Sequence, residues 1–555
     1  MKINKNKIYI YLPVLLSIFL VGGIVLGNWF CSLRVKSIVS SEFNKQHFSI
    51  KPGLNVGSGF SLNPKTDKIT TALQYILNEY VDTVSIERMN ESVMPALLDN
   101  LDPHSIYIPA KDFQKYNEPL TGIFSGIGVT FNMVEDTVAI INTIPNGPSE
   151  IVGILPGDRI IAIEDSVVAG VNMDSNDIVK MLKGPKGTAV RVKIARYGIR
   201  EPLEFNITRD DIPIYSIDIA SKITDEIGYI KITQFAQTTF KEFMEAIEKL
   251  KAQGVKKLII DLRDNGGGIM EPAIKIADQF LEEGQLIVYT EGKTRPRNNE
   301  FATSSGILKH DQVVVLINEG TASASEILAG ALQDNDRGII IGRRSFGKGL
   351  IQEQMQFRDG SALRLTVARY YTPTGRSIQK PYNNGREEYY HDLAIRMMRG
   401  EFETTDSIHF ADSLKYVTPG GKIVYGGGGI MPDIFVPFDT TGITPYYTRI
   451  RAMGLIHRFA FKYTDKHRSQ LEKFTTAGEI SNFLDKKNLI ADFVSFASLN
   501  GVNPVYSEIA ESRVFIETMI KAFIARNIID SEGYYPIMRA LDNTLEIAID
   551  TLSKT

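Results

Sequence analysis

The sequence predicts a mixed α/β multidomain protein, and three features of its 555 residues indicate this fold class. Short apolar runs bounded by glycines alternate with amphipathic stretches between residues 227 and 341, as strands and helices alternate in an αβ core. A glycine-rich β pattern fills residues 119–208, and apolar residues recur at helical spacing from Tyr446 to the end. We therefore predict an αβ core over 209–437, with the β-rich domain inserted before it and a helical domain over 438–555.

Composition narrows the functional classes. The net charge of −3 disfavours a nucleic-acid-binding protein. Cys31 is the single cysteine, so neither an intrachain disulfide nor a cysteine-based metal cluster can form. The seven histidines are scattered without metal-ligand spacing. We expect no metal and no cofactor, and His104 receives no catalytic role.

The N-terminus carries a membrane signal. Three lysines precede a charge-free apolar run from Ile8 to Leu33. At about 1.5 Å per residue, a helix over this run crosses a hydrocarbon core of about 30 Å. The alternative, a cleaved signal peptide, has an apolar region of about 7 to 15 residues and a small-residue cleavage site, which the residues before Cys31 lack. We predict an uncleaved single-pass anchor (1–33) in the inner membrane, a linker (34–62), and a catalytic part in the periplasm.

Two further segments precede the αβ core. Residues 63–118 carry apolar stripes at helical spacing and are expected to form a small helical cap, a dimer contact or plain core helices. The β-rich domain is expected to contain strands near 138–144, 189–196 and 203–208, with one helix over 175–182.

The αβ core contains a glycine-rich turn. An apolar strand over Leu258–Leu262 ends in a turn with three consecutive glycines, and a helix follows from Met270. The turn lacks the lysine and hydroxyl residue of a phosphate-binding loop, which weakens the interpretation as a nucleotide-using enzyme without removing it. Three glycines equally suit a backbone that closely approaches a substrate.

A serine and a lysine lie further along the core. The strand Val313–Ile317 leads to Ser323, which begins a helical pattern, so unpaired backbone N–H groups are expected around it. A second strand, Gly338–Ile341, leads to the glycine-flanked Lys348. One helix and one strand between Ser323 and Lys348 are enough to bring the two side chains together.

These residues fit amide hydrolysis, which needs a nucleophile, a base and donors for the oxyanion. Ser323 is the predicted nucleophile, with Ser325 as its competitor. Lys348 serves as base if burial beside its apolar neighbours disfavours its charged form. Gln352 is placed to fix the lysine rotamer, and the oxyanion donors are the N–H groups of Ala324 and Gly267.

The motifs as a set resemble those of the C-terminal processing peptidases, also called tail-specific proteases. Order and spacing match from about residue 66 to 436 in four motifs: LIIDLRDNGGG (258–268), TASASE (321–326), SFGKGLIQ (345–352) and SALRLTVARYYTPTGR (361–376). The resemblance implies that Ser323 is the nucleophile, Lys348 the base and Gln352 its support. The sequence departs from the usual family motifs at Thr321, at Ser345 and in the turn 264–266. None of these departures removes a chemical role.

Residues 119–208 resemble a PDZ domain, in the run 147–160 and in the Gly-Ile-Gly-Val segment ending at Val129. PDZ domains bind a peptide C-terminus as an added strand, with its carboxylate on a glycine loop. The resemblance implies that Ile127, Gly128 and Val129 hold the peptide. These glycines equally suit a tight turn at the start of a strand, and that alternative stays open.

The sequence therefore predicts a membrane-anchored serine endopeptidase that cleaves extracytoplasmic proteins near their C-termini, where the PDZ domain recognises them. A non-catalytic peptide-binding adaptor is the alternative from another class. The expected partners are protein or peptide C-termini and the membrane, without nucleic acid. The helical regions are expected to offer surfaces for homo-oligomerisation.

Overall fold

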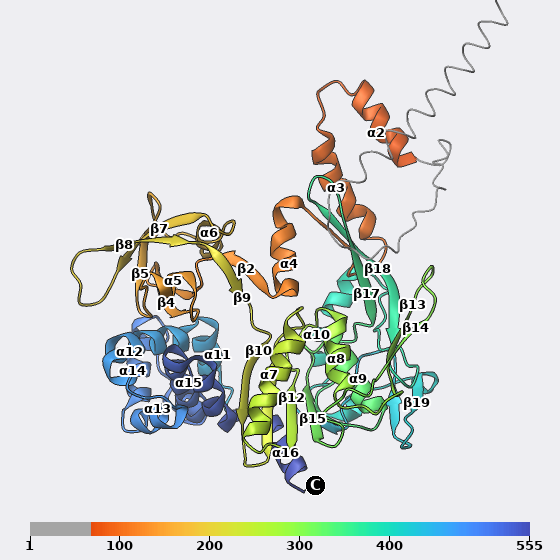
Figure 1. The fold of residues 1–555 in the computed structure, drawn as a ribbon. Helices are drawn as coiled ribbons and strands as arrows, with labels where there is room; N and C mark the ends of the chain where they lie inside the picture. The colour runs from red at the N-terminus through yellow and green to blue at the C-terminus, as the bar shows by residue number, and fades with distance from the viewer. Residues whose placement is uncertain (1–67, 555) are drawn as a thin grey trace, which may run out of the picture. The chain divides into compact units, whose positions relative to one another are not determined.

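The computed structural model describes residues 68–554 (Figure 1). The predicted anchor and linker lie outside these described residues. Between 68 and 554, none of the helices combines the length and apolar character needed to span a bilayer. The chain divides into two compact units, of which the first ends at Ile86 and contains the amphipathic helix α2 (Lys68–Glu79).

The second unit opens with helix, turn and strand. Helix α3 (Ile86–Leu98) is followed by a turn in which Asp102 accepts hydrogen bonds from the N–H groups of His104 and Ser105, at 2.8 and 3.0 Å. Strand β1 (Ile106–Ile108) then pairs antiparallel with a strand of the core. The short 3-10 helix η1 (Ala110–Asp112) and helix α4 (Phe113–Thr121) follow. The predicted helical region thus also supplies one strand to a core sheet.

The PDZ-like domain forms as the sequence predicts. Its sheet has the order β3-β4-β5-β7-β8, with the short β6 (Ser166–Val167) beside β5. The predicted helix is α6 (Ser175–Leu182), and the sheet closes over a core of branched residues that includes Ile140, Ile160 and Val192. Strands β2 (Ile123–Gly126) and β9 (Asp210–Pro213) pair antiparallel where the chain enters and leaves this domain. The remaining bounds are β3 (Val129–Val134), β4 (Thr137–Thr143), α5 (Pro148–Ile151), β5 (Arg159–Ile163), β7 (Ala189–Ala195) and β8 (Leu203–Thr208).

A six-stranded sheet forms the αβ core, in the order β10-β11-β12-β15-β16-β21. All pairs are parallel except the edge pair of β10 with β11. Because parallel strands end at one edge, the loops after β12 and β15 meet there, where ligands bind in open α/β sheets. The strands are β10 (Ile217–Lys222), β11 (Ile227–Ile232), β12 (Lys257–Asp261), β15 (Gln312–Ile317), β16 (Ile339–Gly342) and β21 (Ile434–Phe435).

Helices cover both faces of this sheet. On one face α7 (Thr239–Ala252), α8 (Met270–Asp278) and α9 (Ala324–Asp334) bury side chains such as Phe243, Ala277 and Leu328 in the main core. On the other face α16 (Asn543–Lys554), the last helix of the chain, packs Leu545 and Ile549 against the strands.

A second sheet joins β1 to β18 (Ala362–Tyr371), β13 (Leu286–Glu291) and β14 (Asn298–Phe301), and β17 (Leu350–Gln356) also pairs with β18. The segment after β18 contains helix α10 (Arg386–Met398) and the short helices η2 (Thr405–Ser407) and η3 (Asp412–Leu414). It is followed by the hairpin of β19 (Lys415–Val417) and β20 (Ile423–Tyr425).

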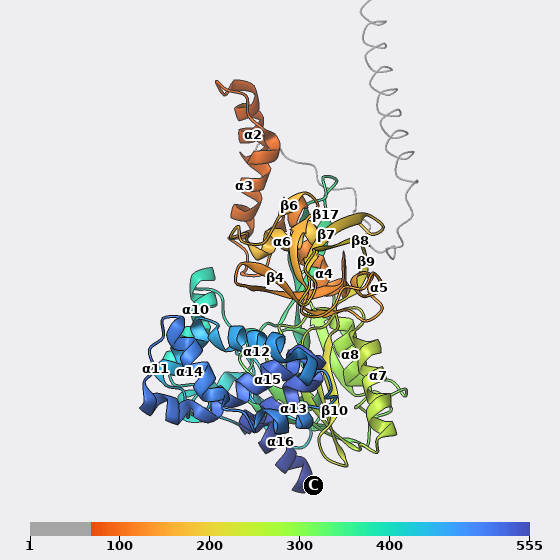
Figure 2. The same ribbon diagram turned by 90° about the vertical axis from the view of Figure 1, so that its left-hand side faces the viewer.

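The predicted C-terminal helical region is confirmed, and its helices gather around α15 (Figure 2). It also contacts other parts of the unit. Phe461 is buried with Val134 and Ile141 of the PDZ-like domain, where Arg159 pairs with Asp465 at 2.7 Å. Helix α16 packs on the core sheet, and α15 also reaches its edge strand β10, where Ser531 Oγ donates to Asp218 at 2.8 Å. The bounds are α11 (Pro445–Ala452), α12 (Leu455–Leu471), α13 (Ala477–Leu484), α14 (Leu489–Leu499), α15 (Tyr506–Met538) and η4 (Arg539–Leu541).

Candidate active site

Ser323 lies at the predicted junction between a strand and a helix, directly before α9. Its backbone has φ of 56° and ψ of −117°, outside the regions that non-glycine residues favour. Such a conformation costs about 1 to 3 kcal/mol and persists where surrounding contacts hold it, often at functional sites. Here Thr321 Oγ1 donates to Leu262 O at 2.8 Å and Ala322 N donates to Asn265 O at 2.9 Å. The serine loop is therefore tied to the loop after β12.

Lys348 lies in the irregular segment between β16 and β17. Its Nζ donates to Gln352 Oε1 at 3.2 Å, as the sequence predicts for a glutamine that orients the lysine. Burial lowers the pKa of Lys348 below its ordinary value, and the neighbouring Arg364 charge lowers it further. A lysine with a lowered pKa loses its proton more readily than an ordinary lysine, which suits it to act as a base.

One cavity of about 460 Å³ brings the predicted residues together. Ser323 and Lys348 line it with Gln352, and the two backbone positions predicted for the oxyanion, Gly267 and Ala324, complete that set. Residues that lie up to 85 positions apart in the sequence therefore share one site, which is open to a substrate.

The glycine turn after β12 approaches the nucleophile closely. Gly267 has φ of +95°, and a Cβ added there would lie 2.7 Å from Ser323 Cβ and from Ala322 O. Only glycine fits this position, which agrees with a backbone that nears a substrate. In the described part of the chain, the Ala324 N–H has no backbone acceptor, whereas the Gly267 N–H donates to Asn265 Oδ1 at 2.9 Å. An oxyanion would therefore compete with Asn265 for Gly267, and the oxyanion assignment stays a prediction.

Glu326 connects the nucleophile with the base, and the sequence interpretation missed it. This fully buried carboxylate accepts the backbone N–H of Ser323 and of Lys348, each at 2.9 Å, and that of Gly347 at 2.7 Å. The Ser345 hydroxyl is a fourth donor. Burial raises the pKa of Glu326, although these donors oppose the rise. The motif Ser-x-x-Glu, which is typical of a helix N-terminus, was the available signal.

Tyr370 makes a second bridge between the two segments. Its hydroxyl lies 2.7 Å from Lys348 O and 3.0 Å from Ser323 O, and its side chain is fully buried. The backbones around the serine and the lysine are thus held from both sides.

His104 is not catalytic in the sequence interpretation, yet its backbone belongs to the site. Gln352 Nε2 donates to His104 O, so the turn before β1 helps to orient the glutamine that contacts Lys348. The imidazole contacts the Tyr389 hydroxyl at 2.8 Å, and burial together with the Lys348 charge lowers the pKa of His104 to about 4. The ring is therefore neutral near pH 7. No pattern in the sequence indicates this contact.

An Arg364→Gln variant should move the pH dependence of hydrolysis. The rate constant kcat/KM rises as Lys348 loses its proton, so the midpoint of this rise reports the lysine pKa. Removing the Arg364 cation raises that pKa, because one of the groups that lowers it is gone. We expect the midpoint to shift to higher pH. Rates measured between pH 5 and 11 check this, with the exposed Arg369→Gln on the same strand as control; equal midpoints in both variants contradict it.

The PDZ-like domain carries an apolar groove of about 140 Å³. Among the described residues, the N–H groups of Ile127 and Gly128 have no backbone acceptor, as a carboxylate-binding loop requires. The groove lies between this loop and α6, and its walls include Phe131, Val179 and Leu182. Its shape fits the predicted peptide-binding role, which stays a prediction for these residues.

The fold and the site together define a serine-type peptidase with an appended PDZ domain. Three family models match the chain: peptidase family S41 over residues 226–384, the PDZ domain over 125–207, and a family of unknown function (DUF8443) over 446–530. The first two matches coincide with the αβ core and the inserted domain.

Relatives with assigned names agree. A carboxy-terminal-processing protease of Bartonella bacilliformis is 36% identical over 309 residues, which are 55% of this chain and 70% of the relative. The carboxy-terminal processing protease CtpA of Bacillus subtilis is 34% identical and is covered over 67% of its length, with 57% of this chain. The chain belongs to peptidase family S41, among the carboxy-terminal processing proteases. Its membership confirms the predicted enzyme class, and the nucleotide-using enzyme is no longer an alternative.

The chain is also similar to proteins of solved structure. The photosystem II D1 C-terminal processing protease is 24% identical with a TM-score of 0.36, and the match covers 66% of this chain and 86% of that one. The PDZ domain of a carboxy-terminal protease from Vibrio cholerae, in complex with peptide, is 30% identical with a TM-score of 0.15, covering 16% of this chain and 97% of that one.

Proposed function

We propose that this protein is an endopeptidase that uses a Ser323–Lys348 dyad to cleave extracytoplasmic proteins near their C-termini. The observation that carries the proposal is the shared cavity, in which a strained serine and a partly buried lysine with a lowered pKa lie beside a glycine turn. The predicted domains have corresponding roles: residues 119–208 bind the chain end, 209–437 cleave, and 1–33 hold the enzyme at the membrane.

The geometry supports a two-stage reaction. Neutral Lys348 Nζ takes the hydroxyl proton as Ser323 Oγ bonds to the scissile carbonyl carbon, and the carbonyl oxygen becomes an oxyanion beside Ala324 N–H and Gly267. The lysine then gives this proton to the departing amine, which leaves an acyl-enzyme. Water, deprotonated by Lys348, attacks the ester and releases the new C-terminus and Ser323 Oγ–H. Gln352 keeps the lysine oriented in both stages.

The groove of the PDZ domain is the proposed site for the substrate's end. Its apolar walls suit an apolar terminal side chain, and its two unpaired N–H groups suit a free carboxylate. The relatives' names state carboxy-terminal processing. Location in the periplasm follows from the predicted anchor, which lies outside the described residues. A homo-oligomer through the helical regions likewise stays a prediction.

Cleavage should depend on a free C-terminal carboxylate. We expect an unfolded protein substrate ending in an apolar residue to lose about tenfold or more in kcat/KM when its C-terminus is amidated, since each factor of ten corresponds to about 1.4 kcal/mol of binding. Initial rates for the two matched substrates measure this. Equal rates would remove the PDZ groove from the proposal, and cleavage of neither substrate would favour the adaptor function.

A further inference from the structure

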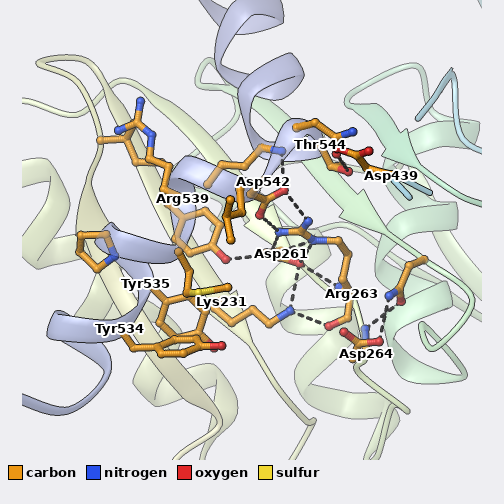
Figure 3. A pocket seen from close by; sticks show the side chains of 18 of the residues that line it. Lys231, Asp261, Arg263, Asp264, Asp439, Tyr534, Tyr535, Arg539, Asp542 and Thr544 are labelled. Carbon is orange, nitrogen blue, oxygen red and sulfur yellow. Dashed lines mark hydrogen bonds and ion pairs between the residues drawn. The ribbon is translucent and has the colours of Figure 1, made fainter. Parts of the chain in front are cut away.

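The C-terminal extension, residues 438–555, places one carboxylate against the six-stranded sheet of the αβ core. Asp542 lies between η4 and α16, beyond the region matched by the peptidase family model. Its two oxygens accept hydrogen bonds from Arg263, at 2.8 Å from Nη1 and 2.6 Å from Nη2 (Figure 3). This bidentate geometry fixes the plane of the guanidinium group as well as its position.

Arg263 belongs to a compact charged network at the end of β12. Its Nη2 also donates to Asp261 Oδ2 at 2.6 Å, and Lys231 Nζ donates to Asp261 Oδ1 at 3.1 Å and to Arg263 O at 2.6 Å. Burial alone would raise the pKa of Asp261, but the Arg263 and Lys231 charges outweigh burial and hold it well below its usual range. The network thus pairs two carboxylates, Asp261 and Asp542, with two basic side chains, Lys231 and Arg263. Removing the charge of Asp542 leaves an excess cation in a largely buried site.

The network continues directly into the glycine turn. Arg263 precedes Asp264, whose N–H donates to Asn318 Oδ1 at 2.8 Å, and Asn265 Nδ2 donates to Ile232 O at 2.9 Å. Asn265 Oδ1 in turn accepts the Gly267 N–H at 2.9 Å, so a displacement of Arg263 would be passed along these contacts toward Gly267. Gly267 lies against Ser323 with no room for a Cβ. A small displacement there changes the position of the N–H groups that face the reacting carbonyl.

Other contacts dock the extension without Asp542. The apolar face of α16 packs on the sheet, and Lys257 Nζ donates to Leu552 O at 2.8 Å. Ser531 Oγ donates to Asp218 at 2.8 Å. A cavity of about 690 Å³ lies beside the network, between the extension and the strand ends. The extension can therefore stay docked on the sheet when the contact between Asp542 and Arg263 is lost.

We propose that Asp542 is a positioning residue for the oxyanion turn: through Arg263, the C-terminal extension fixes Gly266–Gly268 beside Ser323. The inference rests on the proposed Ser–Lys function and assigns part of the catalytic geometry to a segment outside the matched protease region. It also gives the C-terminal extension a role in the reaction itself.

The test is the full-length Asp542→Asn variant. Asparagine removes the charge but remains a good N-cap, which matters because Asp542 Oδ1 also accepts the Leu545 N–H at 3.0 Å. We expect kcat for an unfolded protein substrate to fall about 10- to 100-fold, since small misplacements of catalytic groups have effects of this size. KM and the pH midpoint should stay unchanged, because the groove and the neighbours of Lys348 are untouched.

A peptide aldehyde separates positioning from general damage. Its adduct with the serine carries an oxyanion, so its affinity should fall by the same factor as kcat in Asp542→Asn. Asp542→Glu should keep more of the kcat and of the aldehyde affinity than Asp542→Asn does. Arg263→Lys, which loses the bidentate contact, should show a fall in kcat and in aldehyde affinity alike. Lys257→Met, which removes a docking contact remote from the turn, should match the wild type.

Each of the following results would overturn the inference: wild-type kcat in Asp542→Asn, a fall in kcat without a parallel fall in aldehyde affinity, or unfolding of the variant by circular dichroism, which would assign Asp542 to stability. A Lys257→Met variant that is equally impaired would do so as well. If Ser323→Ala is inactive while Asp542→Asn is fully active, this inference alone fails. If Ser323→Ala retains turnover, the proposed function fails.

Discussion

Replacing Ser323 with alanine, or Lys348 with methionine, is expected to lower kcat by at least about 10³-fold, as removal of either member of a nucleophile–base pair does in serine proteases. Alanine has no oxygen to form the acyl-enzyme, and methionine fills the lysine's apolar surroundings without accepting a proton. Both variants should fold, because neither side chain supplies the contacts that hold its loop. Hydrolysis of an unfolded protein by the purified variants measures the effect.

Ser325 provides the matched control. Its side chain is fully buried and its Oγ donates to Asn265 O at 3.0 Å, so it holds the glycine turn and does not face the cavity. Ser325→Ala should lose about 1 kcal/mol of stability, the net value of one hydrogen bond, while cleavage persists. Loss of activity in Ser325→Ala together with full activity in Ser323→Ala would make Ser325 the nucleophile in place of Ser323.

Glu326→Gln is expected to have the second-largest effect, a loss of roughly 10²-fold in kcat. The carboxylate accepts the N–H groups of both Ser323 and Lys348, and an amide would turn an NH2 group toward one pair of these donors. We also expect the free energy of unfolding to fall by about 1 to 3 kcal/mol, because a buried donor is left without an acceptor. Urea denaturation and steady-state kinetics measure the two effects.

Glu319→Gln is the matched control for this variant. Glu319 lies in the loop before α9 and pairs with Arg343 at 2.8 Å, but its carboxylate accepts no hydrogen bond from Ser323 or Lys348 among the bonds described for it. It should keep kcat within a fewfold of the wild type. If Glu326→Gln behaves in the same way as Glu319→Gln, Glu326 has no role in holding the serine and lysine together.

The sequence predicted those parts of the site that depend on local patterns. Ser323 follows a strand and begins a helix, Lys348 stands between glycines, and Gln352 comes four residues later. These features can be recognised without knowing what packs against them. The same holds for helix 175–182, whose bounds match α6, because its apolar periodicity is strong.

The missed parts depend on contacts between distant segments. The His104 carbonyl reaches Gln352 only because β1 pairs with β18, and a strand of three residues has no periodicity to predict. Asp542 meets Arg263 only because α16 leaves the helical region and packs on the sheet, whereas its sequence is that of any amphipathic helix. Asp542 is 279 positions from its partner, and no pattern in the sequence links the two.

The central claim is that Ser323 is the nucleophile, and the initial rate of protein hydrolysis by purified, folded Ser323→Ala tests it most directly. The account predicts no turnover above the background of an enzyme-free sample, with a circular dichroism spectrum and PDZ peptide affinity equal to those of the wild type. Retained turnover in this folded variant would contradict the account.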